Sequence, residues 1–382
     1  MKLIADREPL LEALTRAARV APRRDTIPIL GHVHLETTRS RLIVTATDMD
    51  RELEIALAAD VRAPGTITVG AQALRDFVHQ SRDGEQVELE IDPKKEGRLV
   101  VRAGRARASL ATLPAEDFPE FRTLDAPAEF VLDGQTLADA LAAVAHAQSD
   151  EETRYYLNGV LLRRIAGERG AGGPSRRLDL VATNGHLLAR IGLEAEAELP
   201  AWPDAIVPRP TVAELAALAA QGGPIAIAIA DTLCTFTREG TTIASKLIDG
   251  FYPDYERVIP PDQPRGFECQ RDELLRAARR CAAIAEADKV GGRPVKVTPV
   301  AGARGSLQIS ARGDLGEITD EIEADVHDAA EVGMSSRYLA DILGAMDGAA
   351  VRFRYEDAGS PMRLTDPADP RAIHVLMPMR VS

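Results

Sequence analysis

The chain has 382 residues, of which 45% are hydrophobic and 27% charged, as in ordinary globular proteins, and this composition excludes a disordered chain. A single hydrophobic core stops growing near ~250–300 residues, so two or three domains are expected. The net charge of -13 argues against a nucleic-acid partner unless the 46 lysines and arginines are gathered on one surface.

Three segments along the chain each predict a short strand, a polar turn and an amphipathic helix. They begin at Leu3, Phe130 and Phe267. Each places apolar residues at helical spacing, which are Leu10, Leu14 and Ala17, then Leu137, Leu141 and Val144, then Leu274, Ala278 and Cys281. The leading leucines lie 127 and then 137 residues apart, which indicates a threefold internal repeat.

A second helix is predicted in each repeat, in the segments VGAQALRDFVHQ from Val69, VPRPTVAELAALAA from Val207 and MSSRYLADILGAM from Met334. Each is followed by glycine and by an alternating segment, VELEI, IAIAI or VRFRY, whose period of two is typical of a half-buried antiparallel strand. We therefore expect three α+β domains, each with two helices on an antiparallel sheet. Polar or proline-rich joins place their boundaries at residues 1–125, 126–262 and 263–382.

No stretch of the chain approaches the ~18 consecutive apolar residues of a membrane helix. The start MKLIADREPLL reaches acidic residues too early for a signal peptide, so a cytoplasmic location and no membrane partner are expected. The cysteines Cys234, Cys269 and Cys281 contain no CxxC pair and suggest neither a disulfide framework nor zinc. No cofactor or metal is predicted.

Six motifs in order carry a family resemblance. They are TIPILG from Thr26, SLATLPAEDFP from Ser109, RYYLNG from Arg154, VATNGHLLA from Val181, SKLIDGFYPDY from Ser245 and MPMR from Met377. With the threefold repeat, they make the chain similar to the β subunit of bacterial DNA polymerase III, the sliding clamp family, over nearly its whole length. The resemblance implies a non-catalytic homodimer that closes head to tail as a ring of six DNA-clamp domains. Helices would line its hole and face double-stranded DNA without sequence preference.

Such a ring needs basic residues on its helices, because phosphate attraction is independent of sequence. Arginines are frequent on the predicted helices of the first and third repeats, at Arg7, Arg16, Arg19, Arg75, Arg82, Arg271, Arg276, Arg279 and Arg280, with Arg23 just beyond the first. The two predicted helices of the middle repeat are poorer in basic residues, with no lysine or arginine from Gln135 to Gln148 and only Arg209 at the start of the second helix. The alternative is that these arginines lie on solvated outer faces.

The resemblance adds DNA contacts at Arg24, Gln72, Tyr155 and Tyr156. Family members commonly have a basic residue in place of Gln72 and a neutral one in place of Glu151, and both departures reduce the local positive potential. The adjacent tyrosines are expected in a strand, where one could stack on DNA or both could divide between core and surface. The predicted DNA-binding residues are Arg24, Gln72, Tyr155, Tyr156, Arg209, Arg276, Arg279 and Arg280.

The resemblance also implies a pocket for short apolar peptides of the polymerase III α subunit, the clamp loader, other polymerases and repair proteins. The matching positions are Leu157, Thr183, Gly185, His186, Leu188, Pro253, Arg257, Val258, Val375, Met377, Pro378, Met379 and Arg380. Methionine side chains adapt to varied peptides. The alternative is a last strand ending at Pro378 with its methionines in the core. Leu187 stands where the family often has a charged residue, so a more apolar pocket edge is expected.

At the dimer contact, Ala108 and Ala285 stand where better-known relatives have larger apolar side chains, while Ile284 remains. Lost volume destabilises an apolar contact, so a weaker dimer is a hypothesis. A clamp paralogue with a specialised repair or resistance role stays open, as does a small molecule in the pocket. A metal phosphoesterase using His32, His34, Asp48 and Asp50 is a weaker alternative, since no third ligand stands at recognisable spacing. The glycines from Gly167 to Gly173 predict an inserted hairpin loop.

Overall fold

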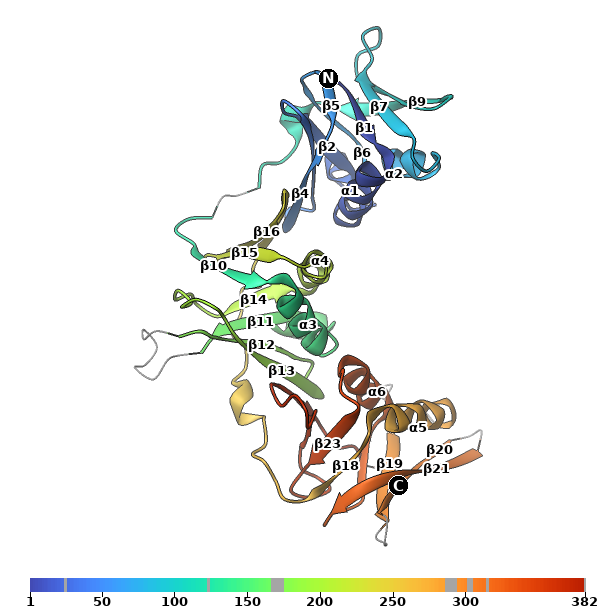
Figure 1. The fold of residues 1–382 in the computed structure, drawn as a ribbon, viewed down its shortest axis with the longest axis vertical. Helices are drawn as coiled ribbons and strands as arrows, with labels where there is room; N and C mark the ends of the chain where they lie inside the picture. Colours follow the sequence, from blue (N-terminus) through green and yellow to red (C-terminus); the bar gives the residue numbers. More distant parts are fainter. Residues whose placement is uncertain are drawn as a thin grey trace. The chain divides into compact units, whose positions relative to one another are not determined.

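The computed structural model describes residues 1–23, 26–121, 124–165, 175–285, 294–300, 305–313 and 316–380 (Figure 1). The chain divides into two compact units, Met1–Gly134 with Gln221–Leu247, and Gln135–Ala220 with Ile248–Ser382. Each unit is built on one antiparallel sheet, of 13 strands in the first and 12 in the second among the described residues. No helix within those ranges is long and apolar enough to cross a membrane.

In its described part the first unit carries two helices, α1 (Arg7–Val20) and α2 (Ala71–His79), which pack against each other and cover strands of its sheet. In sheet order the strands are β10 (Ala128–Asp133), β15 (Pro224–Ile229), β16 (Leu233–Arg238), β17 (Thr241–Lys246), β4 (Arg51–Ala58), β3 (Arg41–Thr47), β2 (His32–Thr37), β6 (Thr66–Gly70), β9 (Ala106–Leu113), β8 (Arg98–Ala103), β7 (Gln86–Ile91), β1 (Lys2–Asp6) and β5 (Asp60–Ala63). Short 3-10 helices span Pro28–Gly31 and Ala115–Asp117.

The second unit carries four helices among its described residues, α3 (Gly134–Ala145), α4 (Arg209–Ala219), α5 (Arg271–Ile284) and α6 (Ser336–Ala345). In sheet order its strands are β14 (Ala205–Pro208), β11 (Gly159–Arg164), β12 (Arg177–Thr183), β13 (Leu187–Glu194), β25 (Ala372–Leu376), β24 (Met362–Thr365), β23 (Ala350–Arg354), β18 (Gly266–Gln270), β21 (Gly316–His327), β20 (Ser306–Gly313), β19 (Pro294–Val300) and β22 (Val332–Ser335). Two 3-10 helices, η3 (Glu152–Leu157) and η4 (Tyr255–Arg257), complete it.

The threefold repeat predicted from the sequence is confirmed in the order of elements. The helices α1, α3 and α5 each follow a short strand, and the nine apolar positions assigned to their buried faces are all at most 1% exposed. The second helices α2, α4 and α6 are followed by β7, β15 and β23, as the alternating segments predict. Helical periodicity thus located the core of every repeat.

Both sheets continue across the predicted domain boundaries. In the first unit β17 pairs antiparallel with β4, from Thr241 opposite Ile55 to Ser245 opposite Arg51. In the second unit β13 pairs with β25, from Leu187 opposite Leu376 to Ile191 opposite Ala372. The middle repeat therefore contributes strands to both units, and the bounds 126–262 stay a prediction.

Candidate partner and DNA surfaces

A cluster of buried side chains in the second unit includes three of the predicted peptide positions, Leu157, Leu188 and Val375. We call it the floor cluster, and it consists of Leu157, Leu161, Val181, Leu188, Ile206, Tyr252, Tyr255, Ile373 and Val375. These residues come from η3, β11, β12, β13, β14, β25 and the segment that leads into η4. Burial raises the pKa of both Tyr252 and Tyr255, so their hydroxyls stay neutral in the core. The fold thus brings residues from distant parts of the chain under one surface.

Apolar side chains next to this cluster remain exposed. Val258 is 42% exposed, Met377 is 37% exposed, and Pro253 is exposed as well. We call these three side chains the peptide surface. Since β25 ends at Leu376, the alternative of a last strand that carries Met377 into the core is wrong. Apolar groups left in water over a packed core suit a contact with another molecule.

The segment that follows β25 is held in place by hydrogen bonds from its backbone. The N–H of Met377 donates to the carbonyl of His186 at 2.9 Å, and the N–H of Met379 donates to that of Gly333 at 2.8 Å. The His186 ring stacks on Tyr338 of α6, with ring centroids 5.7 Å apart and planes 14° apart. Tyr338 was not predicted from the sequence, where it stands on a helix as one aromatic among apolar residues.

The turn between β12 and β13 orients His186. Asn184 Oδ1 accepts hydrogen bonds from the N–H groups of His186 at 2.9 Å and Leu187 at 3.0 Å, and Thr183 Oγ1 donates to the Leu187 carbonyl at 2.7 Å. Gly185 has φ +87°, and a Cβ there would lie 2.5 Å from a nitrogen of Arg154. The positive φ therefore favours glycine at this position, while the close atom belongs to the end of a flexible side chain that can shift.

One of the peptide-site expectations is corrected. Leu187 is 2% exposed and pairs with Leu376 inside the sheet, so it adds to the core and not to an apolar pocket edge. Arg380 is exposed and lines a cavity of about 290 Å³ formed by β19, β20 and β21, with Lys296 and Arg312, and its assignment to the peptide site stays a prediction. Arg257 is exposed and pairs with Asp254 at 2.8 Å.

The predicted tyrosine pair lies in η3, so the expected strand is wrong. Tyr155 is 54% exposed, while Tyr156 packs against the floor cluster, and the two rings meet edge to face at 5.8 Å and 80°. Glu151 forms a bidentate ion pair with Arg154, at 2.8 and 2.9 Å. One tyrosine is therefore available to a ligand, and the cation beside it is already neutralised.

Several arginines predicted to attract DNA instead form contacts that stabilise the fold. Arg7 donates to the carbonyls of Val78 at 3.3 Å and His79 at 3.0 Å at the end of α2, and Arg271 donates to those of Leu343 at 3.3 Å and Met346 at the end of α6. A cation there satisfies carbonyls that the helix leaves without partners. Arg16 is 7% exposed and is buried among α1's apolar neighbours.

The remaining predicted DNA residues differ in availability. Arg209, Arg276 and Arg279 are exposed, and none of them forms an ion pair with another residue in the described ranges. Arg280 is paired with Asp320 of β21, with Nε 2.7 Å from its carboxylate. Gln72 donates to the Ala18 carbonyl at 2.7 Å, so its amide joins α2 to α1. Arg24 lies outside the described residues.

The metal alternative finds no support. His34 bonds Thr66 at 2.7 Å and stacks on Phe118, and Asp50 pairs with Lys246 at 3.0 Å. Asp48 is bound by Arg51, and His32 contacts Thr68. The described residues contain no group of three potential ligands. The predicted loop at Gly167–Gly173 lies outside them.

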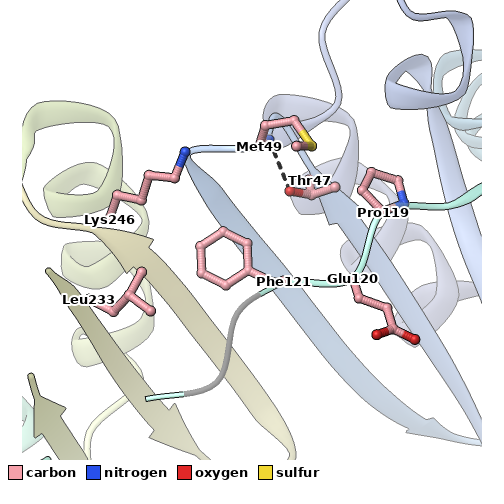
Figure 2. Close-up of a pocket in the computed structure, with 7 residues that line it drawn as sticks. All are labelled: Thr47, Met49, Pro119, Glu120, Phe121, Leu233 and Lys246. Atoms are coloured by element: carbon pink, nitrogen blue, oxygen red, sulfur yellow. Dashed lines mark hydrogen bonds between the residues drawn. The ribbon is translucent and has the colours of Figure 1, made fainter. Parts of the chain in front are cut away.

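A cavity of about 180 Å³ in the first unit was not predicted. It forms where the segment after β9 passes over the paired strands β4 and β17 (Figure 2). Figure 2 shows the Phe121 ring between Leu233 and the Thr47–Met49 turn, where the Met49 N–H donates to Thr47 Oγ1 at 3.1 Å. The aromatic residues of the segment DFPEF are the sequence signal that could have located it. Phe121 thus covers the join between the two strands.

Comparisons with known proteins agree with this arrangement. The chain matches the N-terminal, central and C-terminal domains of the DNA polymerase III beta subunit over residues 1–123, 131–254 and 256–380. It is 36% identical over 387 residues to the beta sliding clamp of Caulobacter vibrioides, with both chains covered completely.

Two solved structures are similar over the whole chain. One is the C. crescentus beta sliding clamp with PEG bound to its putative beta-motif tethering region (TM-score 0.90, 35% identity, 99% of that chain). The other is the sliding clamp of Bartonella birtlesii bound to griselimycin (TM-score 0.91, 32% identity, all of that chain). The chain belongs to the DNA polymerase III beta subunit family, the non-catalytic sliding clamps of DNA replication.

Proposed function

We propose that the chain closes as a homodimeric ring of six clamp domains around duplex DNA and tethers polymerases and repair proteins by short peptides. Its domains are bounded at residues 1–125, 126–262 and 263–382, and it works in the cytoplasm. The single observation that carries the tethering role is the exposure of Val258 and Met377, which follow the floor-cluster residues Tyr255 and Val375 closely in the chain. His186 is bonded to the backbone of Met377. Exposed apolar side chains over a rigid base bind peptides without refolding.

The peptide contact is assigned to the peptide surface, His186 and the edges of the floor cluster at Leu157, Leu188 and Val375. Binding of a fluorescein-labelled peptide of the polymerase clamp-binding type tests it. His186→Ala and Met377→Ala are each expected to weaken binding about tenfold, since interface residues of this kind contribute 1 kcal/mol or more. Val300→Ser, on β19 with 43% exposure, is the matched control. Unchanged affinity in both variants contradicts the assignment.

Contacts to DNA are assigned to Arg209, Arg276 and Arg279, with a smaller contribution from Arg280 because Asp320 neutralises it. Retention on a circular plasmid tests the ring directly. A topologically linked protein is released when the plasmid is cut once, whereas a protein bound only by charge dissociates at the same rate from both forms. Release that does not depend on cutting would exclude the ring.

The dimer contact uses Ala108 on β9 and Ile284 at the end of α5, both half-buried in one protomer. Ala285 is 5% exposed, so it offers little surface to a partner protomer. Small side chains give less apolar burial, and we expect monomers at submicromolar concentration. Sedimentation velocity that detects dimers alone at this concentration contradicts the expectation.

A further inference from the structure

We propose that an exposed aromatic pair beside the peptide surface, Phe251 and Tyr155, binds a second part of the partner segment, in which an apolar residue is flanked by lysine or arginine. The inference rests on the proposed function, because this second part is continuous with the peptide that occupies the peptide surface. It adds a specificity determinant that depends on charge.

The aromatic pair is exposed to an unusual degree. Phe251 is 97% exposed, more than any other large apolar side chain in the described ranges, and Tyr155 is 54% exposed. Gly250 brings the two segments together, because a Cβ there would lie 2.8 Å from Tyr156 Cβ and 3.7 Å from Tyr155 Cε2. Two aromatic side chains left in water on adjoining segments favour binding of another apolar group.

The segment that carries Phe251 is anchored on both sides. The Ile248 N–H donates to the Ile206 carbonyl at 2.9 Å, and Tyr252 and Tyr255 are 6% and 1% exposed in the floor cluster. Phe251 is therefore presented by a fixed backbone. Pro253 and Val258 of the peptide surface belong to the same segment, so a bound peptide extends from one contact to the other without a break.

The charge around the pair is negative. Four exposed carboxylates form no ion pair with any residue in the described part of the chain, and they are Asp150, Glu152, Asp249 and Glu256. The nearby cations Arg154 and Arg257 are neutralised by Glu151 and Asp254. Arg209, whose backbone N–H donates to Asn158 at 2.9 Å, is an exposed cation beside η3 and offsets one of the four.

The negative charge around Phe251 and Tyr155 distinguishes between two kinds of ligand, a single-stranded nucleic acid and a basic peptide. Aromatic platforms also bind single-stranded nucleic acid, but they do so inside positively charged grooves. Four carboxylates against one arginine repel phosphates and attract lysine and arginine, which also bind the faces of aromatic rings. A peptide with basic flanks fits both the rings and the charge, and Tyr155 is accordingly assigned to the partner and not to DNA.

The test uses the full-length dimer and a fluorescein-labelled peptide of the polymerase clamp-binding type in three forms. The first form is the clamp-binding sequence alone, called the core. The second carries a lysine–phenylalanine–lysine extension and the third a glutamate–phenylalanine–glutamate extension, and each extension is tested at the N-terminal and at the C-terminal end of the core. The lysine form is expected to bind about fivefold tighter than the core at low salt, with the advantage declining as salt is added. The glutamate form should bind no better than the core.

Two variants separate the contributions. Phe251→Ser and the double variant Asp249→Asn with Glu256→Gln are each expected to remove most of the advantage of the lysine form while leaving core affinity unchanged. Val300→Ser should alter neither. Equal affinity for the lysine and glutamate forms overturns the inference and leaves the proposed function intact. If the core peptide itself fails to bind, both the inference and the proposed function are contradicted. Binding of labelled oligothymidine that Phe251→Ser weakens also overturns it, because the occupant is then nucleic acid.

Discussion

The hydroxyl of Tyr255 donates a hydrogen bond of 3.0 Å to the buried carboxylate of Asp179, beneath the peptide surface. Asp179 is 1% exposed and also accepts two bonds from Arg190, at 2.8 and 3.0 Å. Asp179 and Arg190 lie on neighbouring strands β12 and β13, while Tyr255 belongs to η4. The carboxylate thus joins the sheet to the segment that carries Pro253 and Val258.

Removing the charge of Asp179 should destabilise the second unit strongly. Asp179→Asn is expected to lower the free energy of unfolding by about 3 kcal/mol, because it leaves Arg190 partly buried without its counter-ion. Tyr255→Phe should cost about 1 kcal/mol, the value of one hydrogen bond. Urea unfolding followed by fluorescence of Trp202, the chain's single tryptophan and part of this unit, measures both.

Asp369→Asn is the matched control, because Asp369 pairs with Arg371 on the surface of the same unit. Exposed pairs contribute at most ~1 kcal/mol, so its midpoint should stay close to that of the wild type. Equal effects of Asp179→Asn and Asp369→Asn would show that the buried network adds no stability.

Local patterns in the sequence located the helices and their buried faces, since periodicity depends only on neighbouring residues. They did not show which arginines serve the fold. Arg7 and Arg279 both stand on amphipathic helices, yet only Arg7 reaches carbonyls more than 70 residues away. The pairing of β17 with β4 depends equally on non-local contacts. The tyrosines of η3 resemble a strand by composition, and backbone bonds such as Asn158 N–H to the Tyr155 carbonyl decide otherwise.

A buried histidine, His374, and the half-buried His146 make the second unit sensitive to acid. The rings of His146 and His374 lie 5.3 Å apart. Burial lowers the pKa of His146 to about 4, and burial together with the neighbouring His146 lowers that of His374 to about 3. Unfolded histidine titrates near ~6.5, so the unfolded chain takes up protons first. Stability is therefore complete above that pH and declines as the pH falls toward 4.

The shifted pKa of His374 is expected to lower the free energy of unfolding by about 2 kcal/mol between pH 7 and pH 5. This follows from ~1.4 kcal/mol for each pH unit below the unfolded pKa. In His374→Leu the free energy of unfolding should differ less between pH 7 and pH 5 than in the wild type. Urea unfolding followed by Trp202 fluorescence measures this difference. His327→Gln, a surface substitution in the same unit, is the control. The same pH dependence in His374→Leu and the wild type would contradict the prediction.

Glu52 on β4 has the opposite pH dependence. Burial, and then the nearby Glu54, raise its pKa to about 7. Its protonated form is favoured in the fold, so stability is fully present below the unfolded pKa near ~4.3 and is lost as the pH rises through 7. Glu52→Gln should stabilise the first unit at pH 8 by at most ~1 kcal/mol, since the carboxyl is partly solvated, and have little effect at pH 4. Hydrogen exchange of β4 amides measures the stability of the first unit in both proteins. An equal effect of Glu52→Gln at pH 8 and pH 4 would contradict the prediction.

The arginines of α5 provide the sharpest test of the DNA assignment, because Arg279 and Arg280 are adjacent yet differ in their partners. Arg279 has no ion pair with another described residue, whereas Arg280 is bound by Asp320. Arg279→Gln is expected to reduce the slope of log affinity against log salt by about one, the effect of losing one phosphate contact. Arg280→Gln should reduce it less, because Asp320 already competes with phosphate. Binding to a circular duplex over a salt series measures both slopes, with Arg312→Gln on β20 as the control. A larger change for Arg280→Gln would mean that the ion pair with Asp320 opens on DNA.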